Sequence, residues 1–163
     1  MEEIAIARAF HVASVVVWIG GVTMATVIFI PAIRRSEFGE DWLAAFHAIE
    51  RRFIWVARAA ALIVGVTGFY LVAKLDLWSR FSSIQFWWMD AMLGLWLLFM
   101  IVLFVVEPLV LRGRFLNWAR ADPSAAFAWL QTGHALLLIL AFLTILGAVA
   151  GSHGGSIPIV LLR

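Results

Sequence analysis

The sequence predicts an all-α integral membrane protein, and two observations carry this prediction. Of the 163 residues, 64% are hydrophobic and 13% are charged, whereas about a quarter of the residues of a soluble domain carry charge. The apolar residues also fall into four long runs, and about 20 apolar residues are enough for a helix to cross the hydrocarbon core. Because a backbone in lipid must satisfy its own hydrogen bonds, we expect these runs to be helices.

The four runs predict an antiparallel four-helix transmembrane bundle. Only short loops separate them, so consecutive helices should be antiparallel neighbours in a single transmembrane domain that covers residues 1–163. The expected spans are residues 4–33, 42–73, 84–111 and 123–150, and a short outer tail, 151–163, follows them. This tail is too short to cross the bilayer.

The first span follows an acidic Met-Glu-Glu start, unlike the basic start of a signal peptide, so we expect it to be retained. It carries His11, Ser14, Trp18 and Gly21 on one stripe of the helix. Small residues on this stripe would let a flat ligand or a neighbouring helix approach closely. His11 is then either a cofactor ligand or a histidine near the interface that bonds water or lipid phosphate.

The second span begins with the amphipathic segment "HAIERRFIWVAR", on which His47, Arg51 and Arg58 share one face. We expect this face to point into the bundle, because an unpaired arginine at bilayer depth costs at least about 2.5–3 kcal/mol. The candidate partners for Arg58 are a cofactor carboxylate, Glu50 and Glu107. The alternative is that Arg58 snorkels to the interface.

The third span contains "FWWMDAM", which places Asp90 about two turns inside the helix, beside Met89 and Met92. A carboxylate there would be a partner for His11 or Arg8, or a proton-handling group. The alternative is an aspartate near the helix N-terminus that the helix macrodipole stabilises.

The fourth span begins with a helix start signal, Asp122-Pro123-Ser124. His134 lies about 15 Å above that start at 1.5 Å per residue, where water cannot satisfy it. His153 follows the span in a glycine-flanked turn. That turn either folds back over the bundle or leaves the histidine solvated.

Arginine and lysine in the loops predict the orientation, because short cytoplasmic loops carry an excess of these residues. One side of the bundle carries seven of them and the other side carries four. The first set is Arg34, Arg35, Arg51, Arg52, Arg112, Arg114 and Arg120, and the second is Arg8, Lys74, Arg80 and Arg163. We therefore expect both termini outside, which in a Gram-negative cell means periplasmic, with the protein in the inner (cytoplasmic) membrane.

The absence of cysteine leaves histidine, methionine and carboxylates as metal ligands. Haem b between facing helices suits such a bundle, since histidines can supply the axial ligands and arginines can pair with the propionates. Copper is the rival, because copper(I) accepts imidazole and thioether ligands. The expected cofactor-binding residues are His11, Trp18, Arg51, Arg58, Met92, His134 and His153, and the expected metal ligands are His11, His47, Asp90, His134 and His153.

Depth along the helices restricts which histidines can meet. At 1.5 Å per residue, His11 and His153 lie toward the outer face and His47 lies toward the inner face. His11 and His47 should therefore not ligate the same iron. As the partner of His11 we rank His134 first, because it is the most deeply placed histidine, and His153 second.

The segment "FHVASVVVWIGG" resembles the first helix of the CopD copper-resistance membrane family, in which a histidine precedes an aromatic-x-Gly-Gly turn. Together with "FHAIERRFIW" it resembles the HemJ-type protoporphyrinogen oxidases, four-span proteins of similar length with a Glu-Arg-Arg motif in the second helix. The likeness covers the first two spans best. It implies a haem b bundle with His11 as one axial ligand. The HemJ-type third helix carries His and Lys where this chain has Asp90 and Met92, so His134, His153 or Met92 would supply the second ligand.

These features favour a membrane haem b protein that passes electrons to or from a quinone or a porphyrinogen. It would be an oxidoreductase of the HemJ type or a membrane cytochrome b. The alternatives are a copper transport or copper-tolerance protein of the CopD type, and a structural or assembly subunit of a membrane complex. The expected partners are the lipid bilayer and either a second copy of the chain or a redox protein. The net charge of +2 comes from loop arginines, which we interpret as topology signals and not as a nucleic-acid surface.

Overall fold

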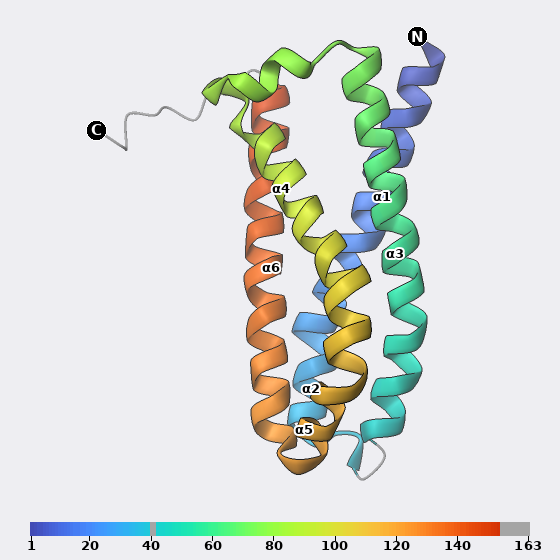
Figure 1. The fold of residues 1–163 in the computed structure, drawn as a ribbon, viewed down its shortest axis with the longest axis vertical. Coiled ribbons are helices and arrows are strands. Elements are labelled where there is room, and N and C mark those ends of the chain that lie inside the picture. The colour runs from blue at the N-terminus through green and yellow to red at the C-terminus, as the bar shows by residue number, and fades with distance from the viewer. Residues whose placement is uncertain (40–41, 154–163) are drawn as a thin grey trace, which may run out of the picture.

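The computed structural model describes residues 1–39 and 42–153, without the side chains of residues 110–112. In chain order the elements are α1 Glu2–Met24, the π-helical η1 Ala25–Phe29, α2 Ile30–Arg34, α3 Trp42–Lys74, the 3-10 turns η3 Trp78–Ser82 and η4 Ile84–Phe86, α4 Trp87–Ile101, the π-helical η5 Val102–Phe115, α5 Leu116–Ala121 and α6 Pro123–Ser152. These elements form four long rods, which lie side by side in Figure 1. The first rod runs from α1 to α2, the second is α3, the third runs from α4 to α5, and the fourth is α6.

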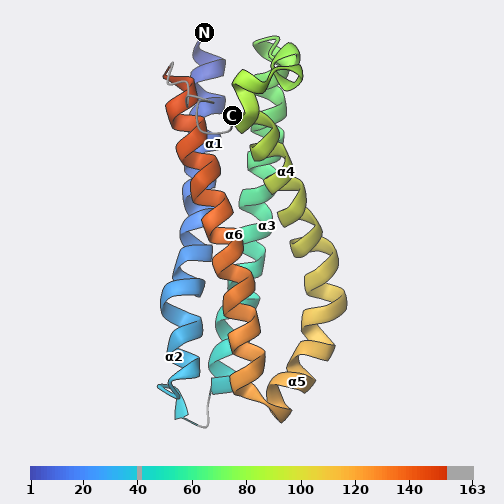
Figure 2. The ribbon, with the colours of Figure 1, turned by 90° about the vertical axis from the view of Figure 1, so that its left-hand side faces the viewer.

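The predicted all-α, four-helix transmembrane bundle is confirmed. The chain is a multi-pass membrane protein in which four stretches are long and apolar enough to cross a membrane: Glu2–Arg34, Trp42–Lys74, Ile84–Leu109 and Pro123–Ser152. No strand occurs among the residues that the structure describes. Successive rods alternate in direction (Figures 1 and 2), so they are antiparallel as expected.

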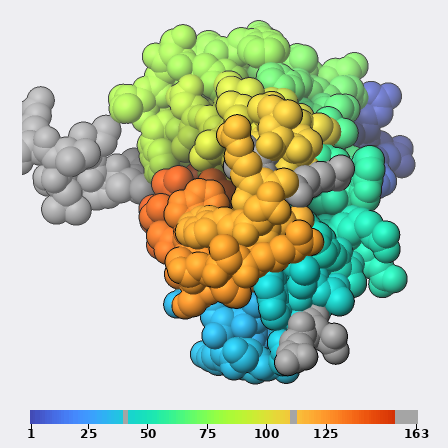
Figure 3. Space-filling model, turned by 60° about the horizontal axis from the view of Figure 1, so that its bottom comes forward, coloured from blue at the N-terminus to red at the C-terminus, as the bar shows by residue number. Residues whose placement is uncertain are grey.

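The two ends of the bundle differ in charge. Met1 and the end of α6 lie at one end, which we call the N-terminal end (Figure 1). The end of α2, the start of α3 and the turn from α5 to α6 lie at the other (Figure 3). We call it the arginine-rich end, after Arg34, Arg35, Arg114 and Arg120.

The predicted spans agree with the observed ones to within a few residues. The fourth helix continues two residues further, to Ser152, and residues 154–163 of the predicted tail lie outside the described residues. The third span, Ile84–Leu109, matches the prediction to within two residues. Its α-helix begins at Trp87, and helical structure continues past Pro108 through η5 and α5 to Ala121.

The helix passes Pro108 because its geometry there is π-helical. In an α-helix the proline ring clashes with the carbonyl of residue i−4 and usually kinks or ends the helix. A π-helix has wider turns, with each carbonyl accepting from residue i+5. The donor expected for the Leu103 carbonyl is then residue 108, which as a proline has no N–H. This carbonyl is available to a donor from another helix.

The rods pack closely where a glycine faces an aromatic ring. Gly21 of α1 lies against the Phe53 ring of α3, as the small-residue stripe predicted. Gly147 of α6 lies against the Trp87 ring of α4, and a Cβ there would come within 2.5 Å of the ring. Each pair brings two helices closer than any larger residue would allow.

Buried side chains form two apolar clusters along the bundle. The central cluster includes Trp18, Ile19, Ile54, Val64, Phe99 and Leu103. The second cluster, at the arginine-rich end, is largely aromatic and includes Phe29, Ile30, Phe46, Phe115 and Phe127. Many other large apolar side chains are exposed on the helix surfaces, as helices that face lipid require.

Candidate functional site

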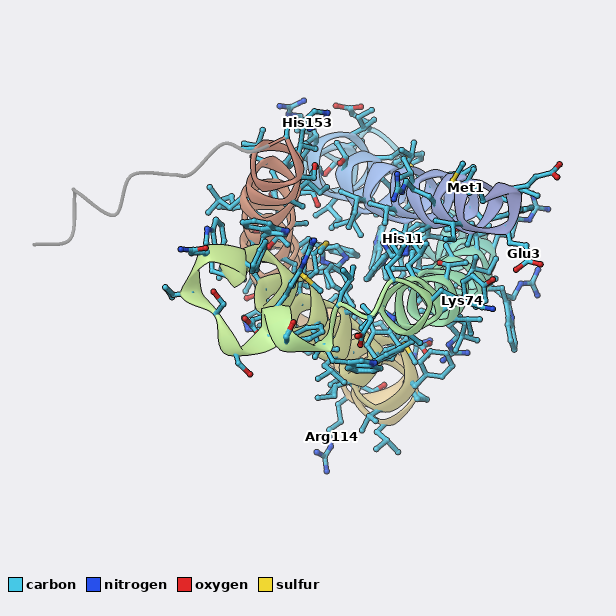
Figure 4. All side chains as sticks on the ribbon, turned by 90° about the horizontal axis from the view of Figure 1, so that it is seen from above. Met1, Glu3, His11, Lys74, Arg114 and His153 are labelled. Atoms are coloured by element: carbon cyan, nitrogen blue, oxygen red, sulfur yellow. The ribbon has the colours of Figure 1, made fainter. Side chains whose placement is uncertain are left out.

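A cavity of about 390 Å³ lies near the N-terminal end between α1, α3, α4 and α6. Most of its lining is apolar, and the chemically distinctive side chains are His11 of α1, Met89 and Met92 of α4, Arg8, and Arg80 of η3. Figure 4 looks into the bundle from this end and shows His11 between α1 and α3, at the side of the bundle interior. We call this space the histidine–methionine cavity.

One ring nitrogen of His11 is bound to α3. Nδ1 lies 3.1 Å from the Val64 carbonyl oxygen and 3.0 Å from the Thr67 hydroxyl. A carbonyl can only accept, so Nδ1 carries the hydrogen. Thr67 accepts from it as well, because its own hydroxyl donates to the Ile63 carbonyl at 2.6 Å. Nε2 therefore keeps its lone pair, which is the arrangement of most histidine metal ligands.

Two glycines of α3 make room for the rings that line this wall. A Cβ on Gly68 would lie 3.2 Å from Cε1 of His11, and a Cβ on Gly65 would lie 2.5 Å from the Trp96 ring. Trp96 Nε1 also donates to the Ala61 carbonyl at 2.9 Å, which holds the indole against α3. The backbone of α3 therefore sets the position of both rings.

The remaining groups of the cavity are two thioethers and two guanidinium groups. Met89 is buried and Met92 is half-buried, and their i, i+3 spacing puts them on one face of α4. Arg8 and Arg80 are exposed, and the Arg80 guanidinium lies 4.7 Å over the Phe86 ring. No carboxylate lines this cavity among the described residues. The arrangement suits a largely apolar ligand that carries anionic groups at one edge.

The structure places Trp18 outside this cavity, in the central cluster. Its ring is buried edge-on against Phe99, with centroids 4.7 Å apart. Its Nε1 has no hydrogen-bond partner in the described part of the chain. The same cluster includes Val64, which lines the histidine–methionine cavity, and Ile54 and Leu103, which line a second cavity. The central cluster therefore forms an apolar layer between the histidine–methionine cavity and this second cavity.

The second cavity, of about 110 Å³, lies in the arginine-rich half and is lined by residues of α1, α3, η5 and α6. Glu50, Glu107 and His134 line it together with apolar side chains. His134 Nδ1 lies 2.9 Å from the Leu130 carbonyl oxygen, one turn earlier on α6. By the same reasoning as for His11, Nδ1 carries the hydrogen and Nε2 keeps its lone pair. We call this space the carboxylate cavity.

Arg58 is held inside the bundle. Its Nη2 donates to the Glu107 carboxylate at 2.7 Å, and Nε and Nη2 donate to the Leu103 carbonyl at 3.1 and 2.8 Å. The two charged side chains are only 12% and 4% exposed. The carbonyl is the one that Pro108 leaves without a π-helical donor. The prediction of an internal partner is confirmed, Glu107 is that partner, and the snorkelling alternative is wrong.

The inward face predicted for His47, Arg51 and Arg58 is only partly correct. Arg51 is exposed. The His47 side chain is 45% exposed, and its Nδ1 lies 3.9 Å from the Glu50 carboxylate. Arg51 and His47 lie nearer the end of the helix, where a long side chain can reach water without an internal partner.

The predicted pairing of His11 with His134 is wrong. By helical rise, His11 lies about 14 Å from the start of α1 and His134 about 16 Å from the opposite end of the bundle, at the start of α6. Each lines a different cavity. They cannot both reach one iron in this arrangement.

Two further predicted ligands lie away from the cavity. His153 is exposed at the end of α6, where its Nδ1 bonds the Val149 carbonyl at 2.9 Å, and Figure 4 shows it apart from His11. Asp90 is exposed in the first turn of α4, because the helix begins at Trp87 and not earlier. Within residues 1–39 and 42–153, no three His, Asp or Glu side chains are placed to hold one metal ion.

A search of family models, curated proteins and solved structures found no match to this chain. The function is therefore inferred from the chain's own residues. Sequence reasoning assigned the cationic role to Arg51 and Arg58, whereas the guanidinium groups at the cavity belong to Arg8 and Arg80. It also missed Gly68, for which the spacing of three residues from Gly65 on the same helix was an available signal.

Proposed function

We propose that the protein is a membrane haem b protein that passes electrons, with the haem in the histidine–methionine cavity. The observation that carries this proposal is the His11 imidazole, whose Nδ1–H is bound to the Val64 carbonyl while Nε2 keeps a lone pair, in a cavity that Met89 and Met92 also line. A ligating histidine needs this orientation. Apolar walls with cationic groups at the edge match an apolar macrocycle that carries two carboxylates.

The chain offers a residue for each contact that such a group needs. His11 Nε2 would be one axial ligand, a thioether of Met89 or Met92 the second, and Arg8 and Arg80 would pair with the propionates. Bound there, haem b would supply a one-electron redox centre. A quinone or a porphyrinogen is the donor or acceptor that fits a membrane setting, which makes the protein an oxidoreductase.

The visible spectrum of the purified protein tests this proposal. We expect a Soret band with about one haem per chain. Met89→Leu and Met92→Leu, made separately, identify the axial thioether, since only one of them should convert a low-spin spectrum to high-spin. A protein that remains colourless after expression with added haem would overturn the assignment.

Copper(I) is the second candidate for the same cavity. One imidazole and two thioethers on one cavity form a soft donor set, which copper(I) prefers. A colourless protein that binds about one copper per chain, and loses it in both methionine variants, would favour a copper transport or copper-tolerance role over electron transfer.

We further propose that the arginine-rich end faces the cytoplasm and both termini lie outside. This end carries Arg34, Arg35, Arg114 and Arg120, and cytoplasmic loops are enriched in such residues. A single cysteine introduced at Glu37 or at Ser79 tests the orientation, because the chain has none of its own. An impermeant thiol reagent added to intact cells should label the Ser79 variant alone, and labelling of the Glu37 variant alone would reverse the topology.

A further inference from the structure

The third rod changes its helical geometry inside the bundle, and the proposed haem site does not use this change. The rod is α-helical in α4, π-helical over the 14 residues of η5, and α-helical again in α5. Figure 2 shows that it continues unbroken from α4 to α5. π-Helical stretches are rare, and those that occur are often found at functional sites. We propose that Arg58 of α3 selects this geometry, and that without its guanidinium group the segment would return to the α-helical register.

The two registers differ in the carbonyl that Pro108 leaves without a donor. Proline has no backbone N–H in either register. In an α-helix the N–H of each residue bonds the carbonyl four positions earlier, so the unpaired carbonyl would be that of Phe104. In a π-helix it bonds the carbonyl five positions earlier, so the unpaired one is that of Leu103. Inside a membrane no water is at hand for an unpaired carbonyl, so a donor from another helix favours the register whose carbonyl it reaches.

Arg58 supplies such a donor to the Leu103 carbonyl. Its Nε and Nη2 bond this oxygen at 3.1 and 2.8 Å. Hydrogen bonds from a charged group are stronger than those between neutral groups. Phe104 meets the same guanidinium with its ring, whose centroid is 5.3 Å from Cζ, and its carbonyl receives no hydrogen bond from Arg58 in the described structure. These contacts therefore stabilise the π-helical register specifically.

The guanidinium group is itself held in place between α3 and η5. Its Nη2 also donates to the Glu107 carboxylate at 2.7 Å, and both side chains are largely out of water. The Trp55 ring of α3 lies 5.3 Å from Cζ, at the same distance as the Phe104 ring of η5. Because the group is shielded in this way, water does not compete for its hydrogen bonds.

The register decides which residues beyond Pro108 face the bundle. A π turn takes up about one residue more than the 3.6 residues of an α turn, so a change of register rotates the chain that follows. In the observed register Phe115 is buried, and its ring centroid lies 6.1 Å from that of Phe46 of α3 and 5.7 Å from that of Phe127 of α6. A return to the α-helical register would turn Phe115 out of this aromatic cluster.

Arg58 therefore acts as a latch between α3 and the third rod. While it is bound to the Leu103 carbonyl, Phe115 completes the aromatic cluster at the arginine-rich end. Once it is released, the segment after Pro108 rotates and the cluster loses one ring. The latch goes beyond the proposed function and does not rest on it, because none of these residues lines the histidine–methionine cavity. A colourless protein would affect the haem proposal alone.

The register can be measured by NMR of the protein in detergent micelles, through the scalar couplings that cross hydrogen bonds. The Glu107 N–H is the reporter, because it bonds the Val102 carbonyl in a π-helix and the Leu103 carbonyl in an α-helix. We expect the wild type to show the coupling to Val102. Arg58→Met with Glu107→Leu removes the latch without leaving a lone buried charge, and should replace this coupling by one to Leu103. The contacts of the Phe115 ring with its cluster should be lost at the same time.

Two controls separate the latch from other effects of the charges. Arg52→Met removes an exposed arginine of the same helix that has no partner in the described structure, and it should leave the Val102 coupling unchanged. Glu107→Gln removes the ion pair but keeps the bond from Arg58 to the Leu103 carbonyl, so it should also keep the Val102 coupling.

Should the double variant not fold, Arg58→Met with Glu107→Gln takes its place with the same expectation, since it keeps a polar side chain at position 107. Three results would each overturn the proposal. They are a wild type whose Glu107 amide couples to Leu103, a double variant that retains the Val102 coupling, and a loss of that coupling in either control.

Discussion

The two cavities contain histidines with the same hydrogen-bonding pattern beside different neighbours. His11 and His134 each donate from Nδ1 to a backbone carbonyl and keep the Nε2 lone pair. His11 shares its cavity with thioethers and guanidinium groups, whereas His134 shares its cavity with Glu50 and Glu107. From this comparison we expect the neighbours of each histidine, and not its tautomer, to determine what its Nε2 binds.

The two cavities also differ in volume. The histidine–methionine cavity has about 390 Å³ and the carboxylate cavity about 110 Å³. The first cavity has room for a larger ligand than the second. Substitutions in the two cavities should therefore have separable consequences.

The largest expected effect comes from exchanging the two histidines for alanine. His11→Ala removes an axial imidazole, so we expect haem content to fall at least tenfold. His134→Ala should leave haem content within error of the wild type, because it lies in the other cavity. Haem-to-protein ratios from absorbance measure both. Loss of haem in His134→Ala, from protein that elutes as the wild type does in size-exclusion chromatography, would contradict the separation of the cavities.

The next effect concerns the ion pair beside the carboxylate cavity. Arg58→Leu leaves the Glu107 carboxylate buried without its guanidinium, and breaking a buried pair in this way typically costs about 3–5 kcal/mol. We expect a correspondingly lower free energy of unfolding in detergent, with a smaller loss in Arg58→Lys, which keeps the charge but not the fork.

The matched control is the double variant Arg58→Met with Glu107→Leu, which removes both charges and should recover part of the stability, since the Leu103 carbonyl still loses its guanidinium donor. Haem content per folded chain should stay constant throughout the series, since Arg58 does not line the histidine–methionine cavity. Reduced haem content in folded Arg58→Leu would instead make this residue part of the cofactor site.

These contrasts show what the sequence could and could not predict. The four spans follow from the length of apolar runs, which local composition determines, so their limits were predicted to within a few residues. Glu107 was among the predicted partners of Arg58 because a buried charge needs a partner, whichever helix supplies it. Packing decides which faces of two helices contact each other, and the spacing of residues along one helix does not reveal this. That is why His134 was assigned to the wrong site.

The π-helical segment was unpredictable for a related reason. Pro108 signals a helix end by local rules, but the guanidinium of Arg58 bonds the Leu103 carbonyl that the proline leaves without a donor. This compensation comes from a residue about 50 positions earlier in the chain. Helical structure therefore continues beyond the predicted end at Leu111, although the span itself, Ile84–Leu109, was predicted to within two residues.

A smaller effect distinguishes the two glycines that shape the wall of the histidine–methionine cavity. Gly65→Ala would place a Cβ 2.5 Å from the Trp96 ring, and overpacking of this kind costs about 1–3 kcal/mol of stability. Gly68→Ala would place one 3.2 Å from His11, a contact that a shift of a few tenths of an ångström relieves. We expect the first to lower the unfolding temperature and the second to lower haem affinity several-fold. Gly133→Ala, with nothing within 4 Å of its Cβ, should do neither.

The smallest expected effect tests whether the hydroxyl of Thr67 contributes to the orientation of His11. Thr67→Val removes one of two acceptors of Nδ1–H and leaves the Val64 carbonyl in place. Because hydrogen bonds within membrane proteins average about 0.6 kcal/mol, haem affinity should fall about threefold. Thr23→Val is the control, since its hydroxyl bonds only the Ile19 carbonyl of its own helix. Haem titration of the apo-protein measures both. A loss of more than about tenfold in Thr67→Val would mean that the hydroxyl, and not the carbonyl, fixes the tautomer, and an equal loss in Thr23→Val would reduce the effect to helix packing.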